Sequence, residues 1–293
     1  MDIYKDITLI LVTYRSEKLI QRNLKVLKKF PTIIVDNSNS SELEFIVKEY
    51  ENIKFIKSTK NLGYGKANNL AISYSKTPFI LIVNPDIILN ENSISFLLAE
   101  FLKDPENIGL LGPSLYDEQM NRRTNGSKSY ISQLKGNKVS NKTNNIPSNN
   151  ICCEFLMGCC YLMKRDFFIS LKGFDESFFM YFEDCDLCDR AIQNGKYIME
   201  VTSAKMIHLE NSSSKKKILT NSKLALIHKI SSYIYLKKNV NFKYLLFQLI
   251  KNFIDYFFRV FINLIFLRFS KFYKNLLRMI SLLLFITLIY KII

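Results

Sequence analysis

The chain has 293 residues, 48% of them hydrophobic and 23% charged, so it is long enough to bury one sizeable core and too apolar for a disordered protein. Its net charge of +15 is uneven, because residues 215–293 hold 15 Lys or Arg and one acid and carry +14, whereas residues 1–214 carry only +1. These basic residues lie among long aliphatic and aromatic runs, which argues against a compact nucleic-acid recognition module. We therefore expect no nucleic-acid partner.

Strand-like and helical patterns alternate along the first part of the chain. Short apolar runs predict strands at 7–12, 32–36, 53–57, 79–83 and 108–111. Helical spacing predicts helices at 16–29, 41–50, from about residue 65, and at 92–103. Alternating strands and helices, with strands apolar enough to be covered on both faces, are typical of a parallel α/β sheet. Residues 121–150 are rich in Asn, Ser and Lys and predict a long mobile loop.

Polar residues follow each of the first four predicted strands. Ligands of such sheets bind at the carboxyl ends of the strands, so these residues are candidates for one binding edge. Any one group could be an ordinary turn, because Asn, Asp, Ser and Gly are common turn residues. The glycines at 63 and 65 complete neither known phosphate-loop spacing. The four groups are Thr13-Tyr14, Asp36-Asn37-Ser38, residues 61–69, and Asn84-Pro85-Asp86.

The stretch from 174 to 190, F-D-E-S-F-F-M-Y-F-E-D-C-D-L-C-D-R, sets carboxylates among aromatic rings. An apolar wall raises the proton affinity of a carboxylate toward the range of a general base, and Asp184 is our candidate. The alternative is that Glu183, Asp184 and Asp186 are only acids in the first turn of an amphipathic helix. Downstream, His208 ends a weak strand without another histidine near it in the sequence, and such an isolated His is more often structural.

The cysteines and the N-terminal residues indicate the cellular compartment in which we expect the protein. The first residues, M-D-I-Y-K-D-I-T, lack the basic start and apolar core of a signal peptide, so we expect a cytoplasmic location. One C-x-x-C pair without a second is not a zinc pattern, and we favour buried free thiols in a reducing compartment. The six cysteines are Cys152, Cys153, Cys159, Cys160, Cys185 and Cys188.

The order of these motifs resembles an inverting family 2 glycosyltransferase of GT-A fold, most of all its rhamnosyltransferase branch. The blocks V-T-Y, V-D-N-S, N-L-G-Y-G-K-A-N-N, N-P-D and G-F-D-E-S-F-F-M-Y-F-E-D-C-D-L-C-D-R match in order and spacing over about residues 7–210. The resemblance implies a Rossmann-like, mostly parallel sheet with flanking helices. It also implies a nucleotide-sugar donor bound by Thr13, Tyr14, Asp36, Asn61, Gly65, Asn68, Asn84 and Asp86.

The resemblance assigns chemistry to the remaining positions. Asp184, in the pair with Glu183, matches the base that removes a proton from the acceptor hydroxyl. Asp86 and His208 match the ligands of a divalent ion, Mg²⁺ or Mn²⁺, on the donor diphosphate. Two departures are visible: N-P-D offers one carboxylate where many relatives have two, and Gly158-Cys159-Cys160 is bulkier than usual, which we expect to tune the acceptor side.

We therefore expect a catalytic domain at 1–214, with a nucleotide-sugar half at 1–115 and an acceptor half at 116–214. The predicted activity is inverting sugar transfer, with rhamnose from dTDP-rhamnose as a candidate donor, to a glycan or lipid-linked acceptor in cell-surface polysaccharide synthesis. The alternatives are a different hexose donor, or an inactive nucleotide-binding scaffold or regulatory protein. The intact Asp86, Asp184 and His208 argue against the inactive protein.

The tail at 215–293 predicts helices with a very wide apolar face. Polar residues recur every three or four positions from 248 to 263 and from 268 to 281. The longest stretch free of charge, 279–290, falls short of the ~20 residues of a spanning helix. We expect the tail to lie at an anionic membrane surface, making the protein peripheral or monotopic on the cytoplasmic face of the inner or plasma membrane. The alternative is that these helices pack on the catalytic domain or pair in a dimer.

Overall fold

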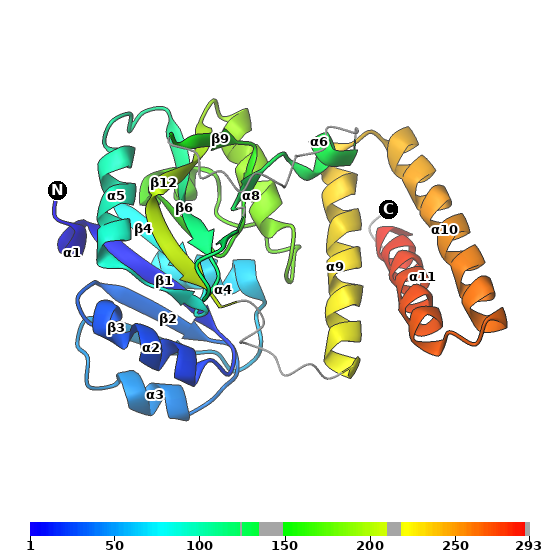
Figure 1. The fold of residues 1–293 in the computed structure, drawn as a ribbon, viewed down its shortest axis with the longest axis horizontal. Coiled ribbons are helices and arrows are strands. Elements are labelled where there is room, and N and C mark those ends of the chain that lie inside the picture. Colours follow the sequence, from blue (N-terminus) through cyan, green and yellow to red (C-terminus); the bar gives the residue numbers. More distant parts are fainter. Residues whose placement is uncertain (124, 135–148, 210–217, 291–293) are drawn as a thin grey trace. The chain divides into compact units, whose positions relative to one another are not determined.

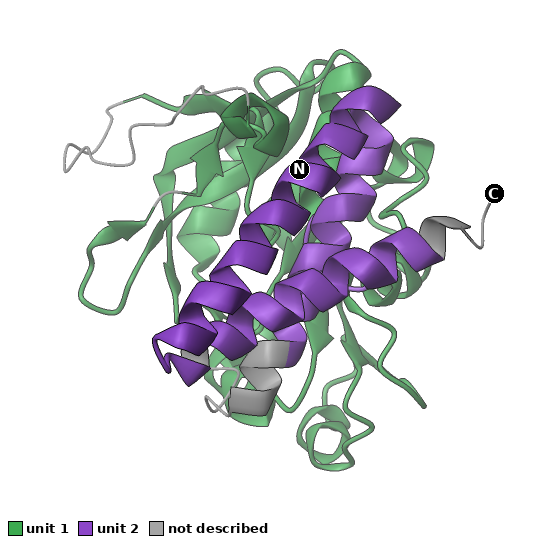
Figure 2. Ribbon diagram, turned by 90° about the vertical axis from the view of Figure 1, so that its right-hand side faces the viewer, with its two compact units in different colours: residues 1–176, 183–214 green, residues 177–182, 215–293 purple. Residues whose placement is uncertain are grey.

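The computed structural model describes residues 1–123, 125–134, 149–209 and 218–290. By its internal contacts the chain forms two compact units, which Figure 2 shows in two colours. Unit 1 comprises residues 1–176 and 183–214, and unit 2 comprises residues 177–182 and 215–293. Residues 177–182, which the sequence places inside the first domain, therefore belong with the tail.

Unit 1 is built around one large sheet whose main path runs β3-β2-β1-β4-β11-β6-β12-β5 (Figure 1). The first four strands of this path are parallel to one another. Strand β11 is antiparallel to both of its neighbours, and β5 is antiparallel to β12. The main strands are β1 (Ile7–Thr13), β2 (Thr32–Asp36), β3 (Ile53–Lys57), β4 (Phe79–Val83), β5 (Ile87–Ile88), β6 (Ile108–Tyr116), β11 (Cys160–Lys164) and β12 (Tyr197–His208).

The sheet is thus mixed, where the sequence predicted a mostly parallel one. The expectation holds for the nucleotide half, in which helices connect successive strands. It fails in the second half, because β11 runs antiparallel to both β4 and β6. Only the crossover connection keeps neighbouring strands parallel.

Both faces of the sheet are covered, as the apolar strands predict. Along β4, Phe79, Leu81 and Val83 enter one core cluster and Ile80 and Ile82 the other, which is the period of two of a strand. Helices α2, α3 and α5 contribute to the first cluster and α4, α7 and α8 to the second. The helices of unit 1 are α1 (Ile3–Asp6), α2 (Glu17–Leu27), α3 (Glu42–Val47), α4 (Tyr64–Ser73), α5 (Glu91–Phe101), α6 (Tyr130–Leu134), α7 (Arg165–Ser170) and α8 (Glu183–Gln193).

The predicted loop at 121–150 is partly structured. It holds β7 (Arg122–Arg123), β8 (Gly126–Ser127) and α6, while residues 124 and 135–148 lie outside the described residues. Glu200 holds β7 and β8 in place. Its buried carboxylate binds the Arg122 guanidinium and accepts a hydrogen bond from the Gly126 N–H at 3.1 Å. No local pattern signals a partner nearly eighty residues away. Strands β9 (Ile151–Cys153) and β10 (Phe155–Leu156) follow.

All six cysteines are free, in agreement with the sequence, but not all are buried. Cys159, Cys160 and Cys188 are buried, whereas Cys152 is exposed and the other two are intermediate. Cys160 lies in β11 with its side chain in the core, 3.7 Å from the Met206 sulfur. The expectation that Cys160 tunes the acceptor side is therefore wrong, since a core side chain meets no substrate.

Unit 2 consists of three helices, α9 (Ile218–Asn239), α10 (Phe242–Ile265) and α11 (Phe269–Tyr290), with α11 packed on both others. Among the described residues, no helix is both long and apolar enough to cross a bilayer. The polarity of the unit is unusual. Asn263, Asn275 and Ser281 are buried and donate to backbone carbonyls of their own helices, while Phe257 and Phe258 are more than half exposed.

Candidate active site

The pairing of two short strand ends brings Asp86 and His208 together. His208 lies opposite Ile87 where β12 pairs with β5, so Asp86 is one residue from that register position. Asp86 Oδ1 lies 3.5 Å from His208 Nε2, and both side chains are largely buried. In the described part of the chain, neither Asp86 Oδ1 nor His208 Nδ1 has a hydrogen-bond partner. Buried polar atoms are usually satisfied, so the unsatisfied carboxylate oxygen beside an imidazole makes this pair the candidate cation site.

Asp184 lies in the first turn of α8, and its carboxylate is held by backbone groups. The Gly158 N–H donates to Oδ2 at 3.0 Å and the Cys185 N–H donates to Oδ1 at 2.9 Å. A Cβ at Gly158 would lie 2.9 Å from the Asp184 Cβ, closer than side chains approach one another. The glycine therefore permits this approach, and the two backbone donors fix the direction of the carboxylate.

The segment Gly158-Cys159 joins the two carboxylates into one site. The Asn84 N–H donates to the Cys159 carbonyl at 2.8 Å, so this segment touches the N-P-D turn as well as Asp184. Burial raises the pKa of the Cys159 thiol well above its usual value, and Cys160 and then the charges of Asp86 and Asp184 raise it further. The charges of both carboxylates therefore act on the same thiol.

Tyr64 belongs to the same site, although the sequence did not single it out. Its hydroxyl donates to the Gly158 carbonyl, and burial together with the charge of Glu183 raises the pKa of its phenol well above the usual value. Tyr64 opens α4 directly after Gly63, whose φ of +82° is unfavourable for other residues. The motif N-L-G-Y-G contained this residue, but no spacing rule connects position 64 with position 158.

The two acids of the E-D pair differ in their surroundings. Burial raises the pKa of Glu183 well above its usual value, and the neighbouring Asp184 raises it further. Glu183 is only 5% exposed, and its Oε2 has no partner among the described residues. Burial also raises the pKa of Asp184, but the hydrogen bonds from Gly158 and Cys185 oppose that rise. Asp184 remains partly exposed, so it is the member that an acceptor can reach as an ionised base.

The third acid of this turn is accounted for by packing. Asp186 is 3% exposed and its Oδ2 lies 2.7 Å from a guanidinium nitrogen of Arg190 one helical turn later. The simple interpretation, an acid that stabilises the helix, therefore applies to Asp186 and not to the whole group.

The predicted donor residues after β1 and β2 form a hydrogen-bonded group. The Thr13 hydroxyl donates to Asp36 Oδ1 at 3.0 Å, and the same carboxylate accepts from the Ser38 hydroxyl at 2.8 Å and the Ser40 N–H at 3.0 Å. Asp36 is fully buried, so its carboxylate shapes the loop after β2. Tyr14, in contrast, is 49% exposed, and the Arg15 guanidinium lies over its ring, 5.6 Å from the ring centroid.

The residues after β3 are more diverse than the sequence suggested. Exposed Asn61 accepts from the Gly63 N–H at 2.9 Å, which closes the turn into α4. Asn68 is buried, donates to the Tyr64 carbonyl at 3.0 Å and has an Oδ1 without a partner in the described chain. A Cβ at Gly65 would lie 2.9 Å from the Phe174 Cβ, so packing alone accounts for that glycine.

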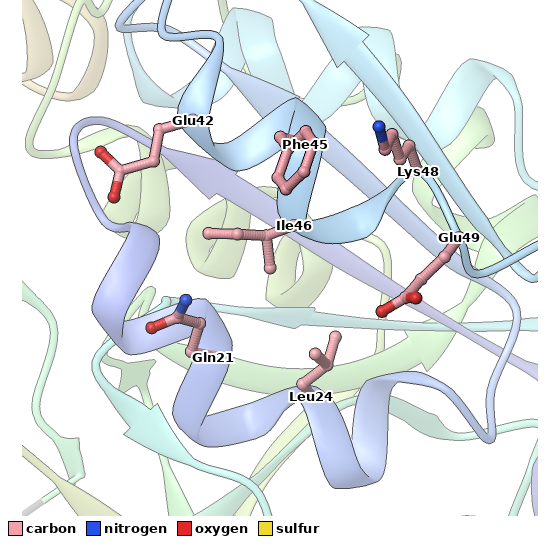
Figure 3. A pocket seen from close by; sticks show the side chains of 7 residues that line it. All are labelled: Gln21, Leu24, Glu42, Phe45, Ile46, Lys48 and Glu49. Carbon is pink, nitrogen blue, oxygen red and sulfur yellow. The ribbon is translucent and has the colours of Figure 1, made fainter.

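A surface hollow lies elsewhere in unit 1, between α2 and α3 (Figure 3). It shares no residue with the group around Asp86 and Asp184, and its lining mixes apolar side chains with charges of both signs. We place the site by its chemistry and not by this hollow. The lining residues are Gln21, Leu24, Glu42, Phe45, Ile46, Lys48 and Glu49.

A family model described as glycosyl transferase family 2 matches residues 8–171, more than half of the chain. The chain belongs to glycosyl transferase family 2. The matched range contains the N-P-D turn, Tyr64 and the Gly158-Cys159 segment, and it ends before α8 and His208. The site of this glycosyltransferase is therefore completed by residues beyond the matched range.

Several curated proteins are similar to this family 2 enzyme. An N-acetylglucosaminyl-diphospho-decaprenol L-rhamnosyltransferase of Mycobacterium tuberculosis is 27% identical over 256 residues, which cover 77% of this chain and 82% of that protein. Rhamnosyltransferase WbbL of Escherichia coli is 28% identical over 221 residues, with 68% and 82% covered. A low-salt glycan biosynthesis hexosyltransferase of Haloferax volcanii is 27% identical over 215 residues, with 69% and 67% covered.

Solved structures share the fold at low identity. A mannosyltransferase from Pyrobaculum calidifontis in complex with GDP-Man and Mn²⁺ superposes with a TM-score of 0.56 at 13% identity, covering 96% of this chain and 74% of that one. The structure of GalNAc-T7 with UDP, GalNAc and Mn²⁺ gives a TM-score of 0.54 at 14% identity and covers 76% of this chain. This chain spans about half of that second structure, 48%. Unit 1 thus has a GT-A-like α/β fold with a mixed sheet.

Proposed function

We propose that this glycosyltransferase moves a sugar from a nucleoside diphosphate donor to a hydroxyl of a glycan or lipid-linked acceptor, with inversion. The observation that carries the proposal is the Gly158-Cys159 segment, which holds Asp184 on one side and the N-P-D turn on the other. These two hydrogen bonds support the proposal that Asp184 acts as the base in the same site in which the N-P-D turn binds the donor diphosphate. Rhamnose from dTDP-rhamnose is the first donor to test, because two of the similar proteins are named rhamnosyltransferases.

In the proposed step Asp184 takes the proton of the acceptor hydroxyl while its oxygen bonds to the anomeric carbon. The bond from that carbon to the diphosphate oxygen breaks on the opposite face, and the electron pair leaves with the nucleoside diphosphate. One such displacement inverts the anomeric configuration. A positioned base of this kind contributes roughly 10²–10⁴-fold.

Asp86 and His208 are the residues that would hold a divalent cation, Mg²⁺ or Mn²⁺. Their fit rests on the two unsatisfied buried atoms and on the preference of these ions for carboxylate and imidazole ligands. When bound, such an ion supplies charge neutralisation on the diphosphate of the donor. Within the described residues no group of three ligating side chains occurs, so donor phosphates would complete the coordination.

The decisive experiment incubates the purified enzyme with a panel of nucleotide-sugars and a polyprenyl-diphosphate-linked sugar acceptor. We expect transfer from one donor, dependent on Mg²⁺ or Mn²⁺, with inverted anomeric configuration in the product by NMR. Donor binding without turnover in any pairing would favour the inactive nucleotide-binding scaffold. Transfer from a hexose donor in place of dTDP-rhamnose would keep the reaction and change the substrate.

We propose further that unit 2 attaches the enzyme to an anionic membrane surface on the cytoplasmic side. Two observations support it: residues 215–293 carry +14, and α10 exposes a row of large apolar side chains that water solvates poorly. A headgroup layer rich in anionic lipid satisfies both properties, whereas a second protein copy of the same charge would repel it. The row comprises Phe247, Ile250, Ile254, Phe257, Phe258 and Phe261.

Vesicle flotation tests this attachment. The intact enzyme should float with phosphatidylglycerol vesicles and less with phosphatidylcholine vesicles, and the triple variant Phe257→Ser, Phe258→Ser, Phe261→Ser should lose most of that binding. The matched control is Phe45→Ser, which changes a 70% exposed ring in unit 1. Equal binding of the triple variant and the control, or no binding by the intact enzyme, would overturn the proposal.

A further inference from the structure

The chain makes a strained turn directly before the catalytic acids. Tyr181 and Phe182 have φ values of +70° and +68°, in the left-handed region that large side chains avoid. Such residues are energetically unfavourable and persist only where surrounding contacts determine them. Phe182 is followed at once by Glu183, the first residue of α8, so this turn sets where the helix begins. The contacts that hold the turn therefore bear on the position of Asp184.

Those contacts come from α9, which belongs to unit 2 together with residues 177–182. The His228 ring packs against both Tyr181 and Phe182, with ring centroids 5.2 Å apart in each pair. Tyr235 lies about two turns after His228 in α9, and its ring packs on Phe182 with the ring centroids 5.5 Å apart. Three aromatic contacts therefore hold the two strained residues, and each of them opposes the cost of the left-handed backbone.

A hydrogen bond and a cation extend this contact along the segment. The Ser231 hydroxyl donates to the Met180 carbonyl at 2.8 Å, and Ser231 is 2% exposed, so the bond is shielded from water. The Lys238 ammonium lies over the Phe178 ring at 5.5 Å from its centroid. Residues 178, 180, 181 and 182 are thus bound to one helix by four of its side chains, which span about three turns.

The chain on the other side of the segment is fixed in unit 1. The Asn69 side chain bonds the Phe174 backbone at both groups, donating to its carbonyl at 2.9 Å and accepting from its N–H at 2.8 Å. Lys66 pairs with Glu176 at 2.7 Å. The segment 177–182 therefore leaves unit 1 from an anchored point and returns to it as α8.

From these contacts we propose that α9 of the helical tail is a positioning element of the active site. His228, Ser231 and Tyr235 hold the turn at 181–182 in its strained form, and this form directs the first turn of α8 so that Asp184 meets the Gly158 N–H. The tail then has a second role besides surface attachment. The inference rests on the proposed role of Asp184 as base.

The test measures transfer kinetics of full-length variants. His228→Ala should lower kcat by about 10-fold, since a displacement approaching 1 Å costs up to ~10²-fold, while the KM for the donor stays unchanged. His228→Phe keeps a ring at this position and should restore most of kcat. The control is Lys237→Ala, which removes an exposed side chain from the same helix.

A second measurement does not depend on turnover. Amide hydrogen exchange at residues 181–187 should accelerate in His228→Ala and Ser231→Ala and remain at the normal rate in His228→Phe and Lys237→Ala. Unchanged exchange in His228→Ala would overturn the positioning role, whether or not a donor had been found. An active intact enzyme whose His228→Ala variant retains full kcat would also overturn it, and absence of transfer by the intact enzyme itself would count against the proposed function instead.

Discussion

The two units use the same kinds of residue in opposite ways. In unit 1, Leu81 and Val83 are buried in the sheet, and polar side chains gather at the strand ends. In unit 2, Phe257 and Phe258 are exposed while Asn263 is buried. A water-soluble domain needs the first arrangement, because apolar burial is the main favourable term in folding. The second arrangement leaves large apolar side chains exposed, which is typical of a surface that binds a partner or a membrane, so apolar content alone does not reveal whether a segment is buried.

The largest difference between the units is expected in transfer activity when the proposed base Asp184 is changed. Asp184→Asn should lower transfer by at least ~10²-fold, because the amide keeps the shape and cannot accept the proton. Donor binding, measured by metal-dependent thermal stabilisation, and flotation with anionic vesicles should both stay unchanged. Glu183→Gln is the matched comparison, and it should retain most activity because the raised pKa of Glu183 already favours its neutral form. The reverse result would move the base by one residue.

Stability should respond differently to the loss of apolar groups in the two units. Leu81→Ala removes a fully buried side chain and should reduce the free energy of unfolding by about 2–5 kcal/mol. Phe258→Ser changes a 57% exposed ring and should cost less than about 1 kcal/mol in vesicle-free buffer. Urea unfolding of both variants measures the loss in the free energy of unfolding. A large loss for Phe258→Ser would mean that the ring packs on protein, which would remove the contrast between the units.

A smaller effect is expected where unit 1 meets the donor. Asp86→Ala and His208→Ala should each weaken metal-dependent donor binding by at least ~10-fold, because each removes a ligand from the proposed ion site. Isothermal titration with nucleoside diphosphate and Mn²⁺ measures it, with a chelator control. Full transfer by either variant in chelator-treated solution would contradict a catalytic metal. Neither change should alter vesicle binding by unit 2.

The smallest effect concerns pH. Burial raises the pKa of Asp184, and the base must be ionised, so kcat should be full at high pH and fall as the pH drops through this raised pKa. The acid limb should therefore lie above about pH 4, where an ordinary aspartate titrates. A kcat profile measured between pH 4 and pH 8 tests the direction. The profile of Glu183→Gln should keep the same limb, since a neutral Glu183 adds no charge, whereas vesicle binding should not follow this limb.

Much of unit 1 could be predicted from local sequence. The apolar runs that became β1, β2 and β4 are continuous, since such strands are covered on both faces. The polar residues after them follow from the rule that open sheets bind ligands at their carboxyl ends. The strand-end rule indicates Asp86, the acidic and aromatic stretch indicates Asp184, and the family resemblance indicates His208; the structure brings Asp86 to 3.5 Å from His208.

Other features were decided only by the tertiary structure, because they depend on partners far away in the chain. Three contacts join positions that no periodicity relates: the antiparallel pairing of β11 with β4, the bonds of Glu200 to Arg122 and Gly126, and the Tyr64 bond to Gly158. The same holds for residues 177–182, whose sequence reads as part of the catalytic motif but whose side chains pack on α9. The sequence by itself determines which chemical groups are available and which local secondary structure each short segment favours. Which distant group satisfies a buried carboxylate or supports a strained turn depends on how the whole chain packs.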